Sequence, residues 1–478
     1  MSYGLSVKTL LEREVKLQPP EGFDLSRVEG ERREPRQFDS TYYDTDDRRL
    51  ARVGVALRRR VENGGGVWQL KLPQGADRLE IELKGGETAP GRAVGLLVGL
   101  TRRRPLEPVA CLRTRRQTVA VHRNGSVLAE VVLDGVSVLD GERVSGAFDE
   151  LEIELVEGTE DDLRHLERLL RGAGARDAAG SSKLARVLGL EPERAAKPAA
   201  GASPAEVLRA AVRAQLAELL VHDPGTRLGA DPEDLHQLRV STRRLRAFLR
   251  AARPLVERDW AEGLRTELGW LGSELGPVRD LDVLLEHLRA ESHSLEPAES
   301  RTFRPILRAL DDQRKRHRSE LLRGLVSDRY LALLDRLETG EQPLLETETT
   351  LYAIWHREFR LLRRAMKALG PDPADGALHA ARIRVKRARY AAELARPALG
   401  KRAAQFVEAA KELQDVLGAH QDAVVAEQVL RERLADAPDA AFAVGRLVER
   451  ERQRRLEARR TYRGAWKRLE QRGRALTE

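Results

Sequence analysis

Two glutamates and a lysine alternate near the start of the chain, in the segment Glu12-Arg13-Glu14-Val15-Lys16. Successive side chains of a β-strand point to opposite faces, so Glu12, Glu14 and Lys16 would share one face. Carboxylate oxygens are the ligands that Mg²⁺ and Mn²⁺ prefer, and an ammonium group is a compact partner for phosphate. The segment is therefore typical of a site for a metal-bound polyanion.

The same alternation recurs on later segments that we expect to be strands. The polar members are Arg58 and Arg60; Gln69 and Lys71; Arg78, Glu80, Glu82 and Lys84; Arg113 and Arg115; Glu130 and Asp134; Glu150, Glu152 and Glu154. For one strand, a half-buried sheet with a solvated face is the simpler explanation. Because whole strands are cationic or anionic, we favour a closed lumen lined by charged side chains.

Length and turn signals divide the chain into two parts. At 478 residues it exceeds the size of a single core. In residues 1–192, short alternating segments separated by turns such as Asn124-Gly125 predict an antiparallel sheet or barrel, with one helix over residues 160–171. Residues 193–204, rich in Ala and Pro, predict a linker. Residues 205–478 have helical periodicity throughout, so we expect an α+β multidomain protein with an all-helical C-terminal domain.

Positive charge is concentrated in the helical part. The chain has 84 Lys and Arg against 76 Asp and Glu, and residues 1–200 hold 33 of each sign, so the whole excess of eight lies beyond residue 200. Such an excess favours a polyanionic partner, which could be nucleic acid, polyphosphate or an anionic surface.

Other features disfavour a membrane or secreted protein. The sequence has no run of about 18 apolar residues and no signal-peptide pattern at its start. Its single cysteine, Cys111, can form neither an internal disulfide nor a Cys-based zinc site. We therefore expect a cytoplasmic protein.

In their order and spacing, these residues resemble the CYTH, or triphosphate tunnel metalloenzyme, family over about residues 5–190. The matching segments are Glu12-x-Glu14-x-Lys16, Tyr43-Asp44-Thr45, Ala56-Leu57-Arg58-Arg59-Arg60, Trp68-x-Leu70-Lys71, Arg78-x-Glu80-x-Glu82, Leu133-Asp134, Glu150-x-Glu152-x-Glu154 and Ser182-Lys183. The resemblance implies an eight-stranded antiparallel β tunnel or barrel with flanking helices. It also implies hydrolysis of a terminal phosphoanhydride with Mg²⁺ or Mn²⁺, by positioning and electrostatics.

The chemistry of such a reaction assigns a role to each candidate residue. A divalent metal would be held by Glu12, Glu14, Glu152 and Glu154. The crowded negative charge of a triphosphate needs several fixed cations, for which the candidates are Lys16, Arg58, Arg60, Lys71, Arg113, Arg115 and Lys183. Catalysis is assigned to Lys71, Glu80 and Glu82.

The helical part contains an internal repeat. His236-Gln-Leu-Arg239-Val-Ser-Thr-Arg243-Arg244-Leu-Arg246 aligns with His379-Ala-Ala-Arg382-Ile-Arg-Val-Lys386-Arg387-Ala-Arg389 at an offset of 143. The segments 275–280 and 417–422 align at an offset of 142. Two near-equal offsets predict a duplicated unit, with copies at about 205–340 and 350–478 that each form a bundle of about four helices.

Each copy carries a basic stripe along one helical face. Positions i, i+3, i+7 and i+10 lie together, which groups His236, Arg239, Arg243 and Arg246 in the first copy and His379, Arg382, Lys386 and Arg389 in the second. For a single stripe, a solvated face would be as good an explanation as function. Like charges at this spacing destabilise an isolated helix, and their recurrence in both copies favours a bound polyanion. A zinc site is disfavoured because neither histidine has a second ligand at metal spacing.

This pattern resembles the CHAD family over about residues 205–478, which implies binding of inorganic polyphosphate in a basic cleft between the two bundles. A nucleic-acid partner is disfavoured because only 4% of residues are aromatic and only Tyr390 lies within a stripe. We therefore expect inorganic triphosphate and polyphosphate as partners, and a cytoplasmic location that could include polyphosphate granules. The Arg-rich segment 441–474 has the spacing of a salt-bridged surface helix.

Three functions stay open from the sequence. The favoured one is a metal-dependent phosphohydrolase of inorganic triphosphate, or a related triphosphate, joined to a polyphosphate-binding module. The second is a non-catalytic polyphosphate-binding protein. The third is a nucleotide or RNA triphosphatase, or an adenylate cyclase, of the same tunnel family.

Overall fold

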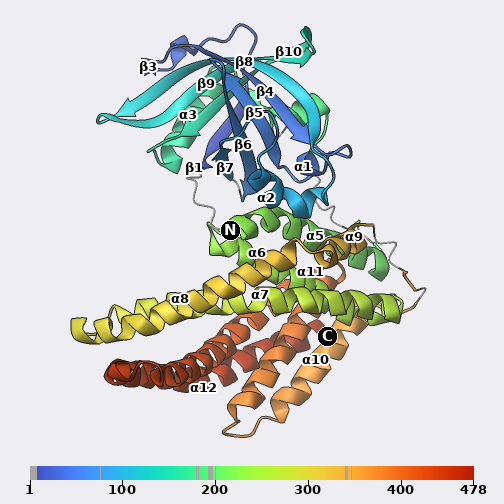
Figure 1. The fold of residues 1–478 in the computed structure, drawn as a ribbon. Helices are drawn as coiled ribbons and strands as arrows, with labels where there is room; N and C mark the ends of the chain where they lie inside the picture. Colours follow the sequence, from blue (N-terminus) through green and yellow to red (C-terminus); the bar gives the residue numbers. More distant parts are fainter. Residues whose placement is uncertain are drawn as a thin grey trace. The chain divides into compact units, whose positions relative to one another are not determined.

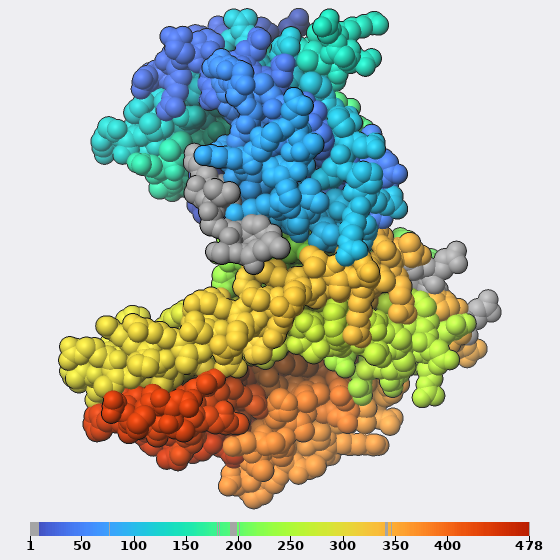
Figure 2. All heavy atoms as spheres, viewed as in Figure 1, coloured from blue at the N-terminus to red at the C-terminus, as the bar shows by residue number. Residues whose placement is uncertain are grey.

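The structure is a computed structural model that describes residues 8–75, 77–178, 180, 182–191, 198–199, 201–339, 343–345 and 347–477. The chain forms two compact units (Figures 1 and 2). The sheet unit comprises Met1–Arg194 and Asp223–Leu228, and the helical unit comprises Ala195–His222 and Gly229–Glu478. Most of the predicted linker, 193–204, lies outside the described residues.

The sheet unit is built on one antiparallel sheet of eleven strands. These are β1 (Lys8–Glu12), β2 (Glu14–Gln18), β3 (Glu31–Arg32), β4 (Arg36–Asp44), β5 (Ala56–Glu62), β6 (Gly65–Gln74), β7 (Asp77–Leu83), β8 (Glu107–Arg123), β9 (Ser126–Asp140), β10 (Arg143–Leu155) and β11 (Arg176–Asp177). Their order is β1-β7-β6-β5-β4-β8-β9-β10-β2-β11, and β3 pairs with β8. Each ladder is antiparallel, as the sequence predicts.

The prediction of eight strands in a closed barrel was wrong in its strand count and in its closure. Two of the additional strands, β3 and β11, have only two residues each. The third arises because Arg13 interrupts the first strand, so that β1 pairs with β7 while β2 pairs with β10. The Arg13 carbonyl accepts a hydrogen bond from the Leu155 amide at 2.9 Å. No ladder joins β1 to β2 among the described residues. Arg13 links β1, at one end of the strand order, to β2, which is next to β11 at the other end.

The outer face of one part of the sheet is apolar and covered by a helix. Helix α3 (Glu160–Gly172) matches the predicted helix, and Thr159 and Asp162 form its capping box. Leu163, Leu166 and Leu170 of α3 belong to one core cluster with residues of β2, β9 and β10, among them Leu17, Val131, Leu151 and Ile153. The alternate residues of these strands, which include the predicted glutamates, therefore point to the inner face.

A second apolar cluster is formed by inner-face residues of the sheet together with two short helices. It joins α1 (Arg49–Arg52) and α4 (Lys183–Leu188) to the sheet through Ala51, Leu184, Tyr42, Ala56, Leu112 and Val136. The remaining helix of this unit is α2 (Gly91–Thr101). Because Ser182 caps the N-terminus of α4, the first residue of that helix, Lys183, is held next to the inner face.

The helical unit agrees with the predicted all-helical C-terminal domain. Its helices are α5 (Pro204–Leu228, whose last six residues are grouped with the sheet unit), α6 (Pro232–Ala251), α7 (Arg258–Ser292), α8 (Pro297–Leu325), α9 (Asp328–Glu338), α10 (Leu351–Lys367), α11 (Asp375–Leu434) and α12 (Ala441–Thr477). Helix α11 is two helices joined at Gly400, whose φ of 60° and ψ of −140° are not helical. Whether these helices form two duplicated four-helix bundles stays a prediction.

Neighbouring helices pack against one another, and one further contact brings distant segments together. Helix α6 packs against α7 and α7 against α8, while α11 packs against α10 and α12. Helix α8 lies beside α12, drawn yellow and red in Figures 1 and 2. Helix α11 also contacts α6, so the two helices that carry the predicted basic stripes are neighbours. Among the described residues, none of the helices has the length and hydropathy that a membrane span requires.

Candidate functional site

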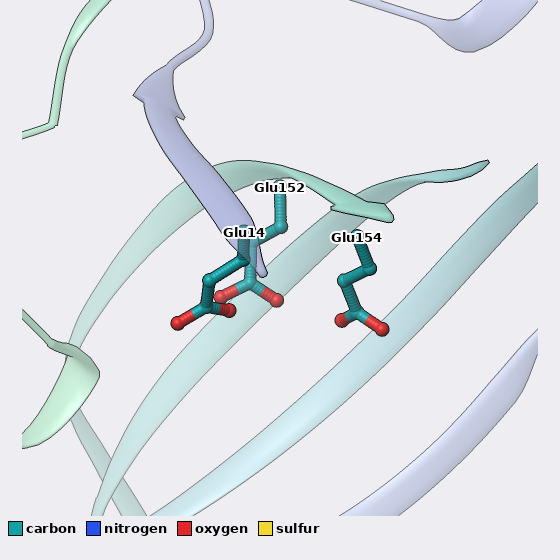
Figure 3. A group of neighbouring side chains, drawn as sticks. All are labelled: Glu14, Glu152 and Glu154. Carbon is teal, nitrogen blue, oxygen red and sulfur yellow. The ribbon is translucent and has the colours of Figure 1, made fainter. Parts of the chain in front are cut away.

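Three glutamates on the inner face of the sheet form a carboxylate cluster. Glu14 is on β2, and Glu152 and Glu154 are on β10, with Glu154 directly opposite Glu14 in the ladder. One carboxylate oxygen from each residue lies within 4.8 Å of the others, and the three side chains are grouped in Figure 3. Their oxygens form a donor set that suits a hard divalent cation.

Two lysines lie against this carboxylate cluster. Lys16 Nζ is 3.1 Å from a Glu14 oxygen and also contacts Glu152. Lys183 Nζ is 2.6 Å from Glu150, 2.9 Å from Glu152 and 3.0 Å from Asp134. Burial lowers the pKa of Lys183, but Glu152, Asp134 and Glu150 outweigh it and hold that pKa well above its ordinary value. Both predicted lysines are therefore fixed, charged groups beside the glutamates.

Arg116 of β8 is a third cation at the cluster, and sequence reasoning missed it. Its guanidinium is 2.8 Å from Asp134, 3.1 Å from Glu152 and 3.3 Å from Glu154. Arg116 lies directly opposite Asp134 in the β8–β9 ladder. The signal was available in the sequence. Val119 and Val121 have apolar side chains that belong on the outer face, and Arg116 is an odd number of positions from each of them, so it points to the inner face.

By the same alternation, Arg113 and Arg115 are not placed at the cluster. Both are exposed. Arg113 forms a bidentate ion pair with Asp39, in which Nε and Nη2 donate to the two carboxylate oxygens, each at 2.8 Å. On β8 the buried Leu112 and Thr114 occupy the opposite face from these arginines. The prediction that Arg113 and Arg115 line the tunnel with the other cations is therefore corrected by the structure.

A second wall of the inner face carries the predicted catalytic residues. Lys71 of β6 is 2.7 Å from Glu12 and 2.8 Å from Glu80. Gln69 donates hydrogen bonds to Glu80 at 2.7 Å and to Glu82 at 3.1 Å. Glu12 thus pairs with Lys71, whereas the sequence grouped it with the metal-binding glutamates. Burial raises the pKa of Glu12 to about 7, while for Glu80 burial is outweighed by Lys71 and the pKa falls to about 2.

The two predicted arginines of β5 extend this wall. Arg58 donates to Gln69 at 2.8 Å and to the Tyr42 hydroxyl at 3.2 Å. Arg60 is 2.7 Å from Glu62, and its guanidinium carbon lies 4.4 Å from the ring centre of Phe38. Arg58 is thus linked through Gln69 to Glu80 and Glu82, whereas Arg60 belongs to a separate ion pair.

In the helical unit, residues of both predicted stripes form one group, which we call the α6–α11 basic cluster. It consists of Arg239 and Arg243 of α6 and Arg382, Lys386 and Arg389 of α11. Burial and the four arginines lower the pKa of Lys386 to about 7. This cluster therefore combines partial burial with an excess of positive charge, and two of its arginines, Arg243 and Arg382, have a buried, unpartnered Nε in the described structure.

The other stripe residues lie at the edge of this cluster. Arg246 and His379 are exposed, and His379 Nδ1 is 2.8 Å from the Gln421 side-chain oxygen. The pKa of His236 is lowered by burial and by Arg279, so this histidine favours the neutral form. Within the cluster itself, Arg239 is paired with Asp280 at 2.8 Å, and Arg389 with Glu393 at 3.2 Å.

Family models match both parts of the chain. A CYTH domain model matches residues 10–182, and a CHAD domain model matches residues 210–431. An uncharacterized protein of Mycobacterium tuberculosis, Rv2226, is 32% identical over 456 residues, which cover 87% of this chain and 86% of the relative. The chain belongs to the CYTH–CHAD fusion proteins. Both family resemblances drawn from the sequence are thereby confirmed.

Solved structures similar to each domain are also known. PptA from Streptomyces chartreusis is 27% identical, with a TM-score of 0.46, and the match covers 55% of this chain and 99% of that protein. The CHAD domain from Ricinus communis is 26% identical, with a TM-score of 0.44, and the match covers 57% and 96%. HpAC1 from Hippeastrum, for which a dominant triphosphatase activity is described, is 19% identical, with a TM-score of 0.28, covering 37% and 96%.

In the CYTH domain, Lys183→Gln should destabilise the fold. The substitution leaves Asp134, Glu150 and Glu152 buried beside a neutral amide, and breaking a buried ion pair from one side costs about 3–5 kcal/mol. Urea unfolding monitored by circular dichroism would measure the loss. Lys84→Gln, which changes an exposed lysine of the same domain, is the matched control and should be close to wild type. Equal stability of the two variants would contradict this account of Lys183.

In the CHAD domain, the basic cluster predicts proton uptake when a polyanion binds. Lys386, with a pKa of about 7, is half neutral near neutral pH, and a bound polyanion would favour its protonated form. Affinity for long-chain polyphosphate should therefore fall as pH rises from about 6 to about 8, by at most about tenfold for one proton. Calorimetry in buffers of different ionisation enthalpy measures the uptake, which Lys386→Met should remove. Uptake that persists in this variant would assign the proton to another group.

Lys386 should also make the stability of the free protein depend on pH. Its pKa is lower in the folded chain than in the unfolded one, where it is near its ordinary value of 10.5. The unfolded state thus binds more protons between about pH 7 and about pH 10, so this residue makes stability rise with pH across that window. Lys386→Met should flatten the rise in urea midpoints measured over that range.

Arg-rich helix α12 buries an apolar face that includes Val444, Leu447 and Val448, and its arginines form ion pairs with other helices. Arg446 pairs with Glu299 at 2.9 Å and Arg450 with Glu291 at 3.0 Å. The spacing predicts three intrahelical pairs, Glu449–Arg452, Glu451–Arg455 and Glu457–Arg460. The first and third are present at 3.9 and 3.7 Å, whereas Arg455 instead pairs with Asp375 and Glu427 at 3.4 Å. Most of the charge on these arginines is therefore used in packing within the CHAD domain.

Proposed function

We propose that the CYTH domain hydrolyses the terminal phosphoanhydride of inorganic triphosphate or a related triphosphate, and that the CHAD domain binds inorganic polyphosphate. The observation that carries the enzymatic part is the cluster of Glu14, Glu152 and Glu154 with Lys16, Lys183 and Arg116 around it. Closely spaced carboxylates beside fixed cations match a substrate that is itself a polyanion carrying a metal ion.

The donor set of the carboxylate cluster fits Mg²⁺ or Mn²⁺. All three ligands would be carboxylate oxygens, and a cation would relieve the repulsion between them. Burial and the neighbouring Glu152 raise the pKa of Glu154, although Arg116 acts in the opposite direction. When bound, such an ion would neutralise phosphate charge and lower the pKa of a water molecule.

The remaining inner-face residues would bind and position the phosphates. Lys16, Lys183 and Arg116 lie on the side of the glutamates, and Arg58 and Lys71 lie on the β5–β6 wall. In the reaction, a water oxygen forms a bond to the terminal phosphorus while the bridging P–O bond breaks, giving orthophosphate and pyrophosphate. Lys71, Glu80 and Glu82 are the residues we propose for catalysis, since they form a hydrogen-bonded group with Gln69 on that wall.

A comparison of phosphate release from three substrates tests this proposal. The full chain would be assayed with tripolyphosphate, ATP and long-chain polyphosphate, each with Mg²⁺, Mn²⁺ or chelator. We expect metal-dependent release from tripolyphosphate above that from ATP. Faster release from ATP would favour a nucleotide triphosphatase, and no release from any substrate would favour the non-catalytic alternative.

Polyphosphate binding by the CHAD domain is supported by the α6–α11 basic cluster. The unpartnered Nε atoms of Arg243 and Arg382 and a lysine of lowered pKa are costly unless an anion compensates them. The guanidinium group of arginine can donate two hydrogen bonds to one phosphate, and a polyphosphate chain could contact α6 and α11 at once. Association with polyphosphate granules in the cell would follow from the same contacts.

A further inference from the structure

The two predicted copies in the CHAD domain bury residues at equivalent positions. At an offset of 143, four buried residues of α5 correspond to four buried residues of α10: Leu208, Val212, Leu216 and Leu219 to Leu351, Trp355, Phe359 and Leu362. On α6 and α11, Leu235, Leu238 and Leu245 correspond to Leu378, Ala381 and Ala388, which are buried too. Residues 143 positions apart therefore occupy equivalent places in the two copies, and so do pairs of residues that contact each other between the copies.

One such pair of positions differs in charge between the copies. Arg244 of α6 and Glu393 of α11 form an ion pair, with Nε and Oε2 3.2 Å apart. Shifted by the offset, the equivalent positions are Arg387 of α11 and Arg250 of α6. Arg387 is thus equivalent to Arg244, whereas Arg250 stands where the other copy has Glu393, so two arginines replace an arginine and a glutamate. Within the described residues, neither Arg250 nor Arg387 makes a hydrogen bond or an ion pair.

The surroundings of this pair leave it short of negative charge. Burial lowers the pKa values of Arg250 and Arg387, and Arg265 of α7 lowers them further. The one carboxylate that raises both pKa values is Glu358 of α10. Glu358 is buried, and its Oε2 has no hydrogen-bond partner in the described structure. The first copy has a neutral residue, Gln215, at the position of Glu358. Arg265 is itself paired with Glu262, which also pairs with Arg253.

We propose that Arg250 and Arg387 form a second phosphate-binding site of the CHAD domain, which takes a phosphoryl group of a condensed phosphate chain. This inference rests on the proposed polyphosphate binding and locates a further contact for the same polymer. Arg250 follows Arg243 of the α6–α11 basic cluster by seven residues, a rise of about 10 Å along the helix. A chain of several phosphates could therefore reach both sites, and the free guanidinium groups of Arg250 and Arg387 suit phosphate oxygens.

The decisive variant is Arg250→Glu, because position 393 in the other copy carries glutamate. The new carboxylate should pair with Arg387 as Glu393 pairs with Arg244, so the variant should fold and unfold at a slightly higher temperature than wild type. We expect its affinity for long-chain polyphosphate, titrated into the full chain without divalent metal, to fall about tenfold. Glu358→Gln should have the opposite effect, with affinity raised about threefold.

Controls separate this inference from the proposed function. Arg460→Glu makes the same charge change on an exposed part of α12, and its affinity should stay near wild type. If Arg250→Glu and Arg387→Gln both bind long-chain polyphosphate as wild type does, while loss of Arg243 and Arg382 weakens binding, the second site is overturned and the proposed function stands. If wild type binds no polyphosphate, the proposed function fails instead. If Arg250→Glu weakens binding of inorganic phosphate but not of the polymer, assignment to a polymer is overturned.

Discussion

Glu14→Gln should lower kcat/KM for tripolyphosphate by about a hundredfold to a thousandfold. The change removes one charged oxygen donor from the cluster with Glu152 and Glu154, and so weakens both metal binding and the electrostatic stabilisation of the transition state. Glutamine keeps the size of the side chain, and Lys16 retains its contact with Glu152. Phosphate release at increasing Mg²⁺ or Mn²⁺ would show a higher metal requirement along with the lower rate.

The control for this variant is Glu167→Gln on α3. Glu167 pairs with Arg171 at 2.8 Å on the helix that covers the outer face, so its loss should leave hydrolysis near the wild-type rate. Binding of long-chain polyphosphate should be unchanged in Glu14→Gln, because that residue is not in the CHAD domain. Wild-type hydrolysis by a folded Glu14→Gln protein would rule out the carboxylate cluster as the metal site.

Replacing both Arg243 and Arg382 by glutamine should weaken binding of long-chain polyphosphate by about a hundredfold, at about 1.4 kcal/mol for each lost contact. It should also reduce the dependence of affinity on salt, because fewer charges are neutralised on binding. The free variant should unfold at a higher temperature than wild type, since it removes two arginines with unpartnered Nε atoms that repel Lys386 and the other arginines of the cluster.

A gain in stability together with a loss of affinity distinguishes a binding site from a packing role. Had the two arginines stabilised the CHAD domain, their replacement would lower the unfolding temperature. Arg460→Gln, which alters an arginine with 76% of its side chain exposed, should change neither quantity. Unchanged polyphosphate affinity in the double variant would count directly against the α6–α11 basic cluster as the binding surface.

The sequence predicted the carboxylate cluster better than the cations around it. Glu14, Glu152 and Glu154 alternate with apolar residues on their own strands, and strand parity alone places them on one face. Arg116 was missed because Arg113 and Arg115 form a more obvious alternating pair. Only Val119 and Val121, which pack on the outer face, show that Arg116 belongs to the inner face and Arg113 and Arg115 do not. Glu12 was misplaced because the break at Arg13 directs β1 to β7 while β2 follows β10.

In the CHAD domain the residue pattern predicted both stripes, and only the family resemblance implied that they share one cleft. Periodicity within one helix says which residues share its face, whereas the contact of α6 with α11 depends on tertiary packing. The lowered pKa of Lys386 depends on that contact, because Arg239 and Arg243 belong to the other helix. For the same reason, the relation between positions 250 and 387 follows from the Arg244–Glu393 ion pair, which periodicity within one helix does not predict.

The interrupted first strand has a consequence for the order in which the CYTH domain can be completed on the ribosome. Residues 8–12 pair with β7, but residues 14–18 pair with β10 and β11, which are synthesised more than a hundred residues later. Contacts of such long sequence separation form slowly, and until they form β2 has an unpaired edge. We therefore expect a nascent chain that ends before residue 151 to expose this edge to chaperones or to other chains. The carboxylate cluster would be assembled among the last features of the domain, because Glu14 meets Glu152 and Glu154 only in that pairing.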